Sequence, residues 1–144
     1  MIGLLITGCS LFSIRFTAQP DESDVLNYTF GGGELGADLT QLVIRDDGHV
    51  SYRYLLPFED SWPQDEINRD YQLSAPETEA LFQSLVDAGL FDLSYAESEG
   101  VDIPRTLITA SVDGHMLEAA MDGVPDAAIH GKIEDLVATI HPER

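Results

Sequence analysis

The stretch LSAPETEALFQSLVDAGLFDL, residues 73–93, contains the signals for both ends of one helix. Ser74 and Glu77 form an S-x-x-E capping box, in which each side chain accepts a backbone N–H that the first turn leaves unpaired. Gly89 can adopt the left-handed conformation that ends many helices. Between these ends, apolar residues recur at helical spacing, namely Leu81, Phe82, Leu85 and Val86. We therefore expect a helix at about 75–88 whose apolar face packs against the rest of the chain.

Two Asp-Gly dipeptides, at 47–48 and 113–114, each lie between two segments with the alternating pattern of a β-strand. Because an Asp-Gly pair favours the positive φ angles of a tight turn, each dipeptide predicts a β-hairpin. The paired segments are 39–45 with 49–56, and 105–112 with 115–121. A further alternating segment at 25–30 predicts a first strand. Asp126 precedes an apolar pattern of helical period, which predicts a second helix at about 127–140.

These elements predict an α+β fold, in which an antiparallel sheet of two hairpins plus a first strand has both helices packed on one face. With 144 residues the chain is long enough for one domain, which we place at 25–144. Segment 57–72 is polar and contains Trp62, the only tryptophan, so we expect a long loop there.

The charge balance departs strongly from that of an average domain. The chain has 26 acidic residues against seven basic ones, which are six arginines and Lys132, and its net charge is −19. Such a surface repels phosphate backbones, so we expect no nucleic-acid partner. Two interpretations remain, general adaptation to high salt or a local acidic face for a basic partner. Because the acids are scattered along the whole chain, we favour adaptation to high salt.

Salt adaptation predicts a stability that rises with ionic strength. Crowded carboxylates repel one another in dilute buffer. Added salt screens that repulsion, because the Debye length falls to roughly 3 Å at molar ionic strength. We expect the midpoint of thermal unfolding to rise markedly between low and molar salt. Thermal unfolding followed by circular dichroism measures this, and an unchanged midpoint would contradict the interpretation.

The amino terminus resembles a lipoprotein signal. An apolar run at 2–8 leads into Ile6-Thr7-Gly8-Cys9, which is similar to a lipobox, and Cys9 is the only cysteine. We interpret residues 1–8 as a signal segment, truncated at its start because no basic residue precedes the apolar run. Residues 9–24 then form a tether, and Cys9 is the candidate lipidation site that anchors the protein to a membrane. The alternative is a cytoplasmic protein whose Cys9 is unmodified.

Motifs for catalysis or metal binding are absent from the sequence, so we predict no catalytic residue, no metal and no cofactor. His49 and His115 each follow an Asp-Gly turn and could bind metal only if the two turns met in space. Asp122, Asp126 and His130 recur every four residues, but N-cap and surface roles explain the last two. For partner binding the candidates are Phe58 and Trp62, because an exposed aromatic side chain can anchor a protein contact.

Several structural motifs between 28 and 140 occur together. They are a glycine-rich start (Gly31, Gly32, Gly33 and Gly36), a hairpin, a helix opened by Leu73-Ser74 and closed at 88–93, and a second hairpin and helix after Val124-Pro125. This pattern resembles the emfourin family, small protein inhibitors of thermolysin-type metalloproteases. The first hairpin is also similar to small lipoprotein domains of unknown function. The lipobox and the Trp62 loop are additional to the short inhibitors.

The emfourin resemblance implies an inhibitor that blocks an active-site cleft with a loop held by rigid hairpins. Our own candidate for that loop is 58–62. We therefore expect a non-enzymatic, extracytoplasmic, monomeric lipoprotein domain that binds a protein partner, with a metalloprotease as the partner that the resemblance implies. The alternatives are a structural envelope lipoprotein, and a hydrolase whose acidic residues converge only in the folded chain.

Overall fold

The computed structural model describes residues 25–32, 38–57, 65–100 and 102–144. Cys9, Phe58 and Trp62 lie outside the described residues, as does the whole of 1–24. The described elements in chain order are β1 (Val25–Gly31), β2 (Leu39–Arg45), β3 (His49–Leu55), β4 (Glu66–Gln72), α1 (Ala75–Asp87), a short 3-10 helix η1 (Leu90–Asp92), β5 (Arg105–Val112), β6 (His115–Asp122) and α2 (Ala127–Ile140).

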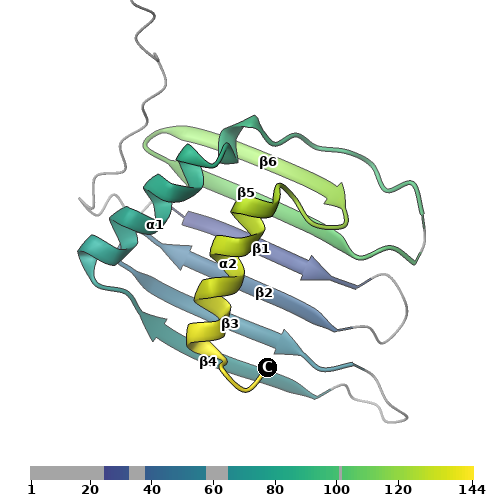
Figure 1. The fold of residues 1–144 in the computed structure, drawn as a ribbon, viewed down its shortest axis with the longest axis horizontal. Helices are drawn as coiled ribbons and strands as arrows, with labels where there is room; N and C mark the ends of the chain where they lie inside the picture. The colour runs from purple at the N-terminus through teal and green to yellow at the C-terminus, as the bar shows by residue number, and fades with distance from the viewer. Residues whose placement is uncertain (1–24, 33–37, 58–64, 101) are drawn as a thin grey trace, which may run out of the picture.

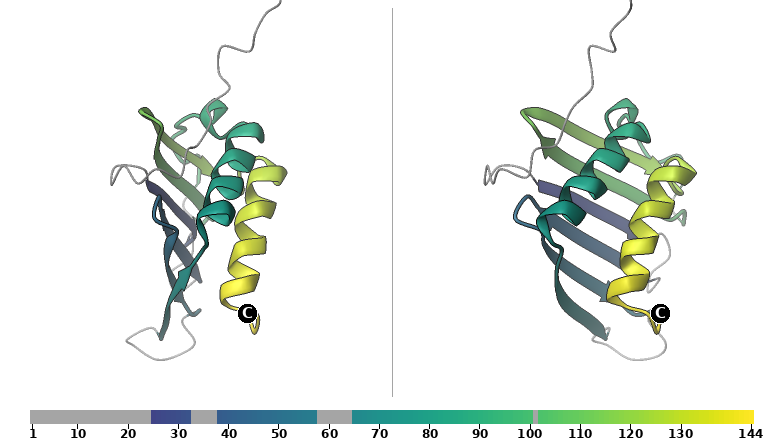
Figure 2. Two further views of the ribbon diagram at one scale, coloured as in Figure 1. Left: turned by 90° about the vertical axis from the view of Figure 1, so that its left-hand side faces the viewer. Right: turned by 60° about the vertical axis from the view of Figure 1, so that its left-hand side comes forward.

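The strands form one six-stranded sheet in the order β4-β3-β2-β1-β5-β6, and each neighbouring pair is antiparallel. Both helices cross the same face of this sheet and leave the other face uncovered (Figures 1 and 2). The predicted α+β fold is confirmed, with both hairpins and both helices at the expected positions. β1 lies in the middle of the sheet, where it joins the two hairpins.

The core lies between the sheet and the two helices. Alternate residues of each strand point toward the helices, because successive side chains of a strand lie on opposite faces. Fully buried members of this layer include Leu26, Tyr28, Leu42, Ile44, Val50, Tyr52, Ile108 and Val112. From the helices, Phe82 and Leu85 of α1 and Ile129 and Ile133 of α2 complete the cluster.

The predicted helix signals act as expected. The Ser74 hydroxyl accepts the Glu77 N–H while the Glu77 carboxylate accepts the Ser74 N–H, so the capping box is complete. Gly89 has a φ of 95° and separates α1 from η1. At the other helix, the Asp126 carboxylate accepts the Ala128 N–H at 2.8 Å and begins α2.

The prediction of a loop over the whole of 57–72 is wrong, because residues 66–72 form the edge strand β4. The segment is polar, yet Ile67 and Tyr71 alternate with exposed residues and are half-buried on the helix side. Arg69 lies between them and donates to the Ile140 carbonyl at the end of α2, at 2.8 Å. Backbone pairing with β3 and these contacts under α2 stabilise a strand that composition alone disfavours.

Candidate functional site

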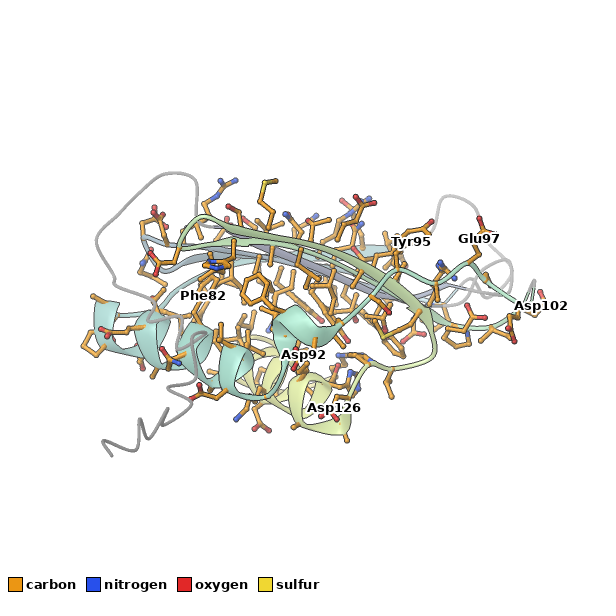
Figure 3. The ribbon with its side chains drawn as sticks, turned by 90° about the horizontal axis from the view of Figure 1, so that it is seen from above. Phe82, Asp92, Tyr95, Glu97, Asp102 and Asp126 are labelled. Atoms are coloured by element: carbon orange, nitrogen blue, oxygen red, sulfur yellow. The ribbon has the colours of Figure 1, made fainter. Side chains whose placement is uncertain are left out.

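The face of the sheet opposite the helices is covered by no other described helix or strand (Figures 1 and 2). Figure 3 views the sheet edge-on, with the helices on one side and free side chains on the other. We call this surface the open face. On the four central strands, its side chains belong to Asn27, Thr29, Leu39, Gln41, Val43, Arg45, His49, Ser51, Arg53, Leu55, Arg105, Leu107, Thr109 and Ser111.

None of these central side chains is a carboxylate, although the chain has 26 acidic residues. Among the described strand residues, the carboxylates on the open face come from its two edge strands alone. They are Glu66 and Asp70 on β4, and Glu118 and Asp122 on β6. The centre of the open face is therefore neutral to basic in a protein that is otherwise strongly acidic.

Ion pairs join Arg53 and Arg105 of the open face to carboxylates on the two edge strands. Arg53 donates to Glu66 from two nitrogens, at 2.7 and 3.0 Å, and to the Gln41 amide oxygen at 3.1 Å. Hydrogen bonds from Asn68 and then from Arg53 lower the pKa of Glu66 below its usual range. The arginine is thus held flat against the sheet between β2 and β4.

A second ion pair joins β5 to the edge strand β6 on the opposite side of the sheet. Arg105 donates to Asp122 at 3.0 Å, and Asp122 also accepts the backbone N–H of Glu99 at 2.9 Å. The pKa of Asp122 is lowered, chiefly by the Glu99 N–H and further by Ser98 and Arg105. A carboxyl with a lowered pKa adds stability above the pKa of the unfolded chain, and this stability is lost as the pH falls through the folded pKa.

This linkage predicts acid-sensitive stability. Unfolded aspartate titrates near pH 3.9, so we expect the contribution of Asp122 to be present at neutral pH and to disappear below about pH 4. The variant Asp122→Asn should flatten the fall in unfolding free energy across that range. Urea denaturation at a series of pH values measures the slope, and identical slopes in the two proteins would contradict this assignment.

Exposed apolar side chains gather at the β5–β6 end of the open face. Leu107 is 44% exposed and Met116 is 84% exposed. Tyr95, 59% exposed, forms an isolated bridge with Ala120 and so continues the row that contains Leu107. The guanidinium of Arg105 lies 5.9 Å from the centre of the Tyr95 ring. Exposed aromatic, methionine and arginine side chains beside uncharged polar ones are typical of protein-binding surfaces.

Two shallow depressions lie on the open face and share Asn27 in their linings. One, of about 420 Å³, lies over β1, β2, β3 and β4 and is lined by Gln41, Ser51 and Arg53 among others. The other, of about 360 Å³, lies over β1, β5 and β6 and includes Met116. Their breadth and their mixed polar and apolar linings suit contact with a surface better than enclosure of a small substrate.

The two histidines that follow the Asp-Gly turns do not meet. Both turns lie at the same end of the sheet, but β3 and β6 are separated by three strands, which corresponds to about 19 Å at four spacings of about 4.8 Å. His49 lies 3.2 Å from Asp70, and the ring of His115 stacks edge-on near Phe91 with 5.9 Å between centroids. The condition for a shared metal site is therefore not met.

The four-residue series Asp122, Asp126 and His130 is also dispersed. Asp122 belongs to the ion pair with Arg105, and Asp126 is the N-cap of α2. His130 is half-buried, with its Nδ1 2.9 Å from the Tyr28 hydroxyl and its ring packed edge-on against Phe30. This contact cannot be recognised from residue spacing, because the polar partner of His130 comes from a strand distant in sequence.

A second tyrosine–histidine pair, which the sequence did not reveal, holds the end of α2 to the sheet. His141 is only 4% exposed, and its Nδ1 lies 3.0 Å from the Tyr52 hydroxyl. Tyr28 and Tyr52 occupy one row of the sheet, since both pair with Leu42. Burial, followed by the charge of Glu134, raises the pKa of Tyr28, so its hydroxyl stays protonated. Both pairs satisfy buried polar groups and fix the position of α2.

The described part of the chain contains no cluster of three or more histidine, cysteine, aspartate or glutamate side chains placed to hold a metal ion. Within the same residues, no helix has the length and apolar composition needed to cross a membrane. Comparison with family models of known proteins gave no match to this chain. A search of curated proteins likewise found no match.

Proposed function

We propose that this chain is a protein-binding domain that contacts its partner through the open face of the sheet. The main support is the distribution of charge, because the four central strands present no carboxylate on this face in a chain of net charge −19. The helix side of the domain exposes carboxylates such as those of Glu79 and Asp135, whereas the open face offers uncharged polar groups, arginines and exposed apolar side chains.

We further propose that Cys9 is lipidated and that the domain is displayed outside the cytoplasmic membrane. The support is the lipobox-like sequence that ends at Cys9 and the polar segment at 18–24 that leads into the domain. Mass spectrometry of the protein from its native membrane tests this proposal, since a diacylated Cys9 has a mass that Cys9→Ser cannot reproduce. An unmodified thiol on the native protein would contradict it.

The partner class that the emfourin resemblance suggests is a thermolysin-type metalloprotease. The test uses the full chain with Cys9→Ser, purified in high salt and titrated against thermolysin with a small fluorogenic peptide. We expect stoichiometric inhibition without cleavage of the domain. Absence of inhibition by a folded domain would contradict the metalloprotease as partner, and Trp62→Ala tests whether the loop at 58–62 is the inhibitory segment.

The open face itself is tested by placing carboxylates on it. Val43→Glu puts negative charge at the centre of the open face and Leu107→Glu puts it among the exposed apolar side chains near β6, whereas Ala80→Glu puts the same charge on an exposed position of α1. Binding should weaken at least tenfold in the first two variants and stay unchanged in the third. The readout is the inhibition titration, or cross-linking to native envelope proteins if thermolysin is not inhibited. Equal effects of all three variants would contradict the open face as the contact surface.

A further inference from the structure

The two edge strands of the sheet, β6 and β4, differ in how far other described residues bond their outward backbone groups. At β6, the Ala96 N–H donates to the Ala120 carbonyl at 2.7 Å, and the Ala120 N–H donates to the Ser94 carbonyl at 3.3 Å. The backbone of Glu99 then bonds the Asp122 side chain. The second half of this edge is therefore closed by the chain itself.

The β4 edge has no such cover from the described residues. The Leu56 N–H donates to the Asp65 carbonyl and the Leu73 N–H donates to the Gly48 carbonyl, each at 2.9 Å. In an antiparallel ladder the backbone groups of every second residue point to the same neighbouring strand, so the backbone groups of residues 67, 69 and 71 also point to β3. The outward backbone groups consequently belong to Glu66, Asn68, Asp70 and Gln72, and none of these groups bonds another described residue.

We infer that β4 binds an extended, basic segment of a partner protein as a seventh strand of the sheet. The outward N–H and C=O groups of Asn68 and Asp70 supply the ladder, as in other cases of β-strand addition. Unpaired edges are usually protected by charged side chains, and here the charges of the protecting side chains select the partner.

Side chains along β4 specify what this segment contains. Glu66 and Asp70 point to the open-face side and are four residues apart, so they fit basic side chains four residues apart in the added strand. The Glu66 carboxylate would be shared between such a side chain and Arg53. Asp70, whose side chain is 75% exposed beside His49, is the more accessible of the two. Ile67 and Tyr71 are half-buried on the helix side and fit apolar side chains there. For an antiparallel strand this gives the order apolar, basic, polar, polar, apolar, basic.

A second copy of the chain fits this edge less well. When two β4 strands pair around a two-fold axis centred on Arg69, Glu66 of each copy lies diagonal to Asp70 of the other. Moving the two-fold axis by one residue, to Asn68 or to Asp70, places a carboxylate directly opposite a carboxylate. The net charge of −19 on each copy adds long-range repulsion. The same two carboxylates thus oppose self-pairing and favour a basic strand.

The inference rests on the proposed protein-binding function, but it concerns a different surface. Leu107→Glu changes the open face and leaves the β4 backbone intact, whereas Asn68→Pro changes the β4 edge and leaves the centre of the open face intact. Asn68→Pro should therefore lose the binding of an added strand, and Leu107→Glu should lose the binding of a partner to the open face. These separate losses distinguish the two proposals.

The experiment uses the isotope-labelled full chain with Cys9→Ser and the blocked peptide Ac-TVKTTVKT-NH2, followed by NMR shifts and amide exchange. We expect the amides of Asn68 and Asp70 to shift and to exchange at least tenfold more slowly with the peptide present. A peptide with both lysines replaced by glutamate should bind at least tenfold more weakly. The double variant Glu66→Lys/Asp70→Lys should reverse this preference.

Proline variants provide the matched control. Asn68→Pro removes one outward N–H of β4 and should abolish peptide binding. Glu118 lies two residues before Ala120, so its N–H also points outward from β6. Glu118→Pro removes that N–H and should leave peptide binding unchanged. If Asn68→Pro does not fold, the charge-reversed double variant still decides. Unshifted β4 amides, equal binding of both peptides, or slow exchange that depends on protein concentration alone would each overturn the inference.

Discussion

Replacing Phe82 with alanine should lower the free energy of unfolding by about 3–5 kcal/mol, the usual range for a large side chain removed from a packed core. Phe82 is 0% exposed and lies on the face of α1 that packs against the sheet. The loss combines the apolar surface no longer buried with the cavity that remains, because the neighbouring strands cannot collapse into it. This helix contributes only Phe82, Leu85 and Thr78 as fully buried residues.

Chemical denaturation at constant high salt measures the effect, with Glu79→Ala as the control. Glu79 is exposed on the same helix, so its substitution should change the unfolding free energy by no more than about 0.5 kcal/mol. A loss below about 1 kcal/mol for Phe82→Ala would mean that the chain repacks at this position, in conflict with a tightly docked α1.

Replacing Gly48 with alanine should cost about 2–5 kcal/mol, far more than the same change in the other hairpin. Gly48 has a φ of +82°, which costs a residue with a Cβ about 1–2 kcal/mol. An added Cβ would also lie 2.7 Å from the Thr78 Oγ1 and closer still to the Leu73 carbonyl oxygen. Resolving such overlaps typically adds about 1–3 kcal/mol.

Gly114→Ala is the matched control for this prediction. Gly114 occupies the corresponding turn and has a φ of +77°, but no atom lies within 4 Å of an added Cβ. Its substitution should therefore cost only the conformational part, about 1–2 kcal/mol. Parallel denaturation of the two variants measures the difference, and equal losses would contradict the close approach of the β2–β3 turn to the start of α1.

Local signals were sufficient to predict most elements of this fold. The capping box at Ser74, the N-cap at Asp126 and the two Asp-Gly turns act through bonds within a few residues. Their outcome therefore depends little on distant parts of the chain. β4 was missed because its stability comes from pairing with β3 and from contacts under α2, and both depend on residues far along the sequence.

The candidate binding surfaces could be predicted from the sequence much less well than the helices and strands. Alternation in each strand indicates which residues share a face, but not which strands are neighbours. The strand order β4-β3-β2-β1-β5-β6 is what places the four strands without a carboxylate on the open face side by side. The same order puts Glu66 and Glu118 at opposite edges of the sheet. A sequence search for clustered residues misses such a surface, because its members are spread from residue 27 to residue 111.

The sequence by itself determined the class of fold, the turns, the helix ends and the excess of negative charge, since each of these depends on composition or on neighbours in the chain. The tertiary structure decided which described strands present no acidic side chain on the open face, which edge strand has outward backbone groups that no described residue bonds, and how His130 and His141 contact Tyr28 and Tyr52. These features arise only when strands distant in sequence pair, because pairing sets both the neighbours of each side chain and the backbone groups that remain free.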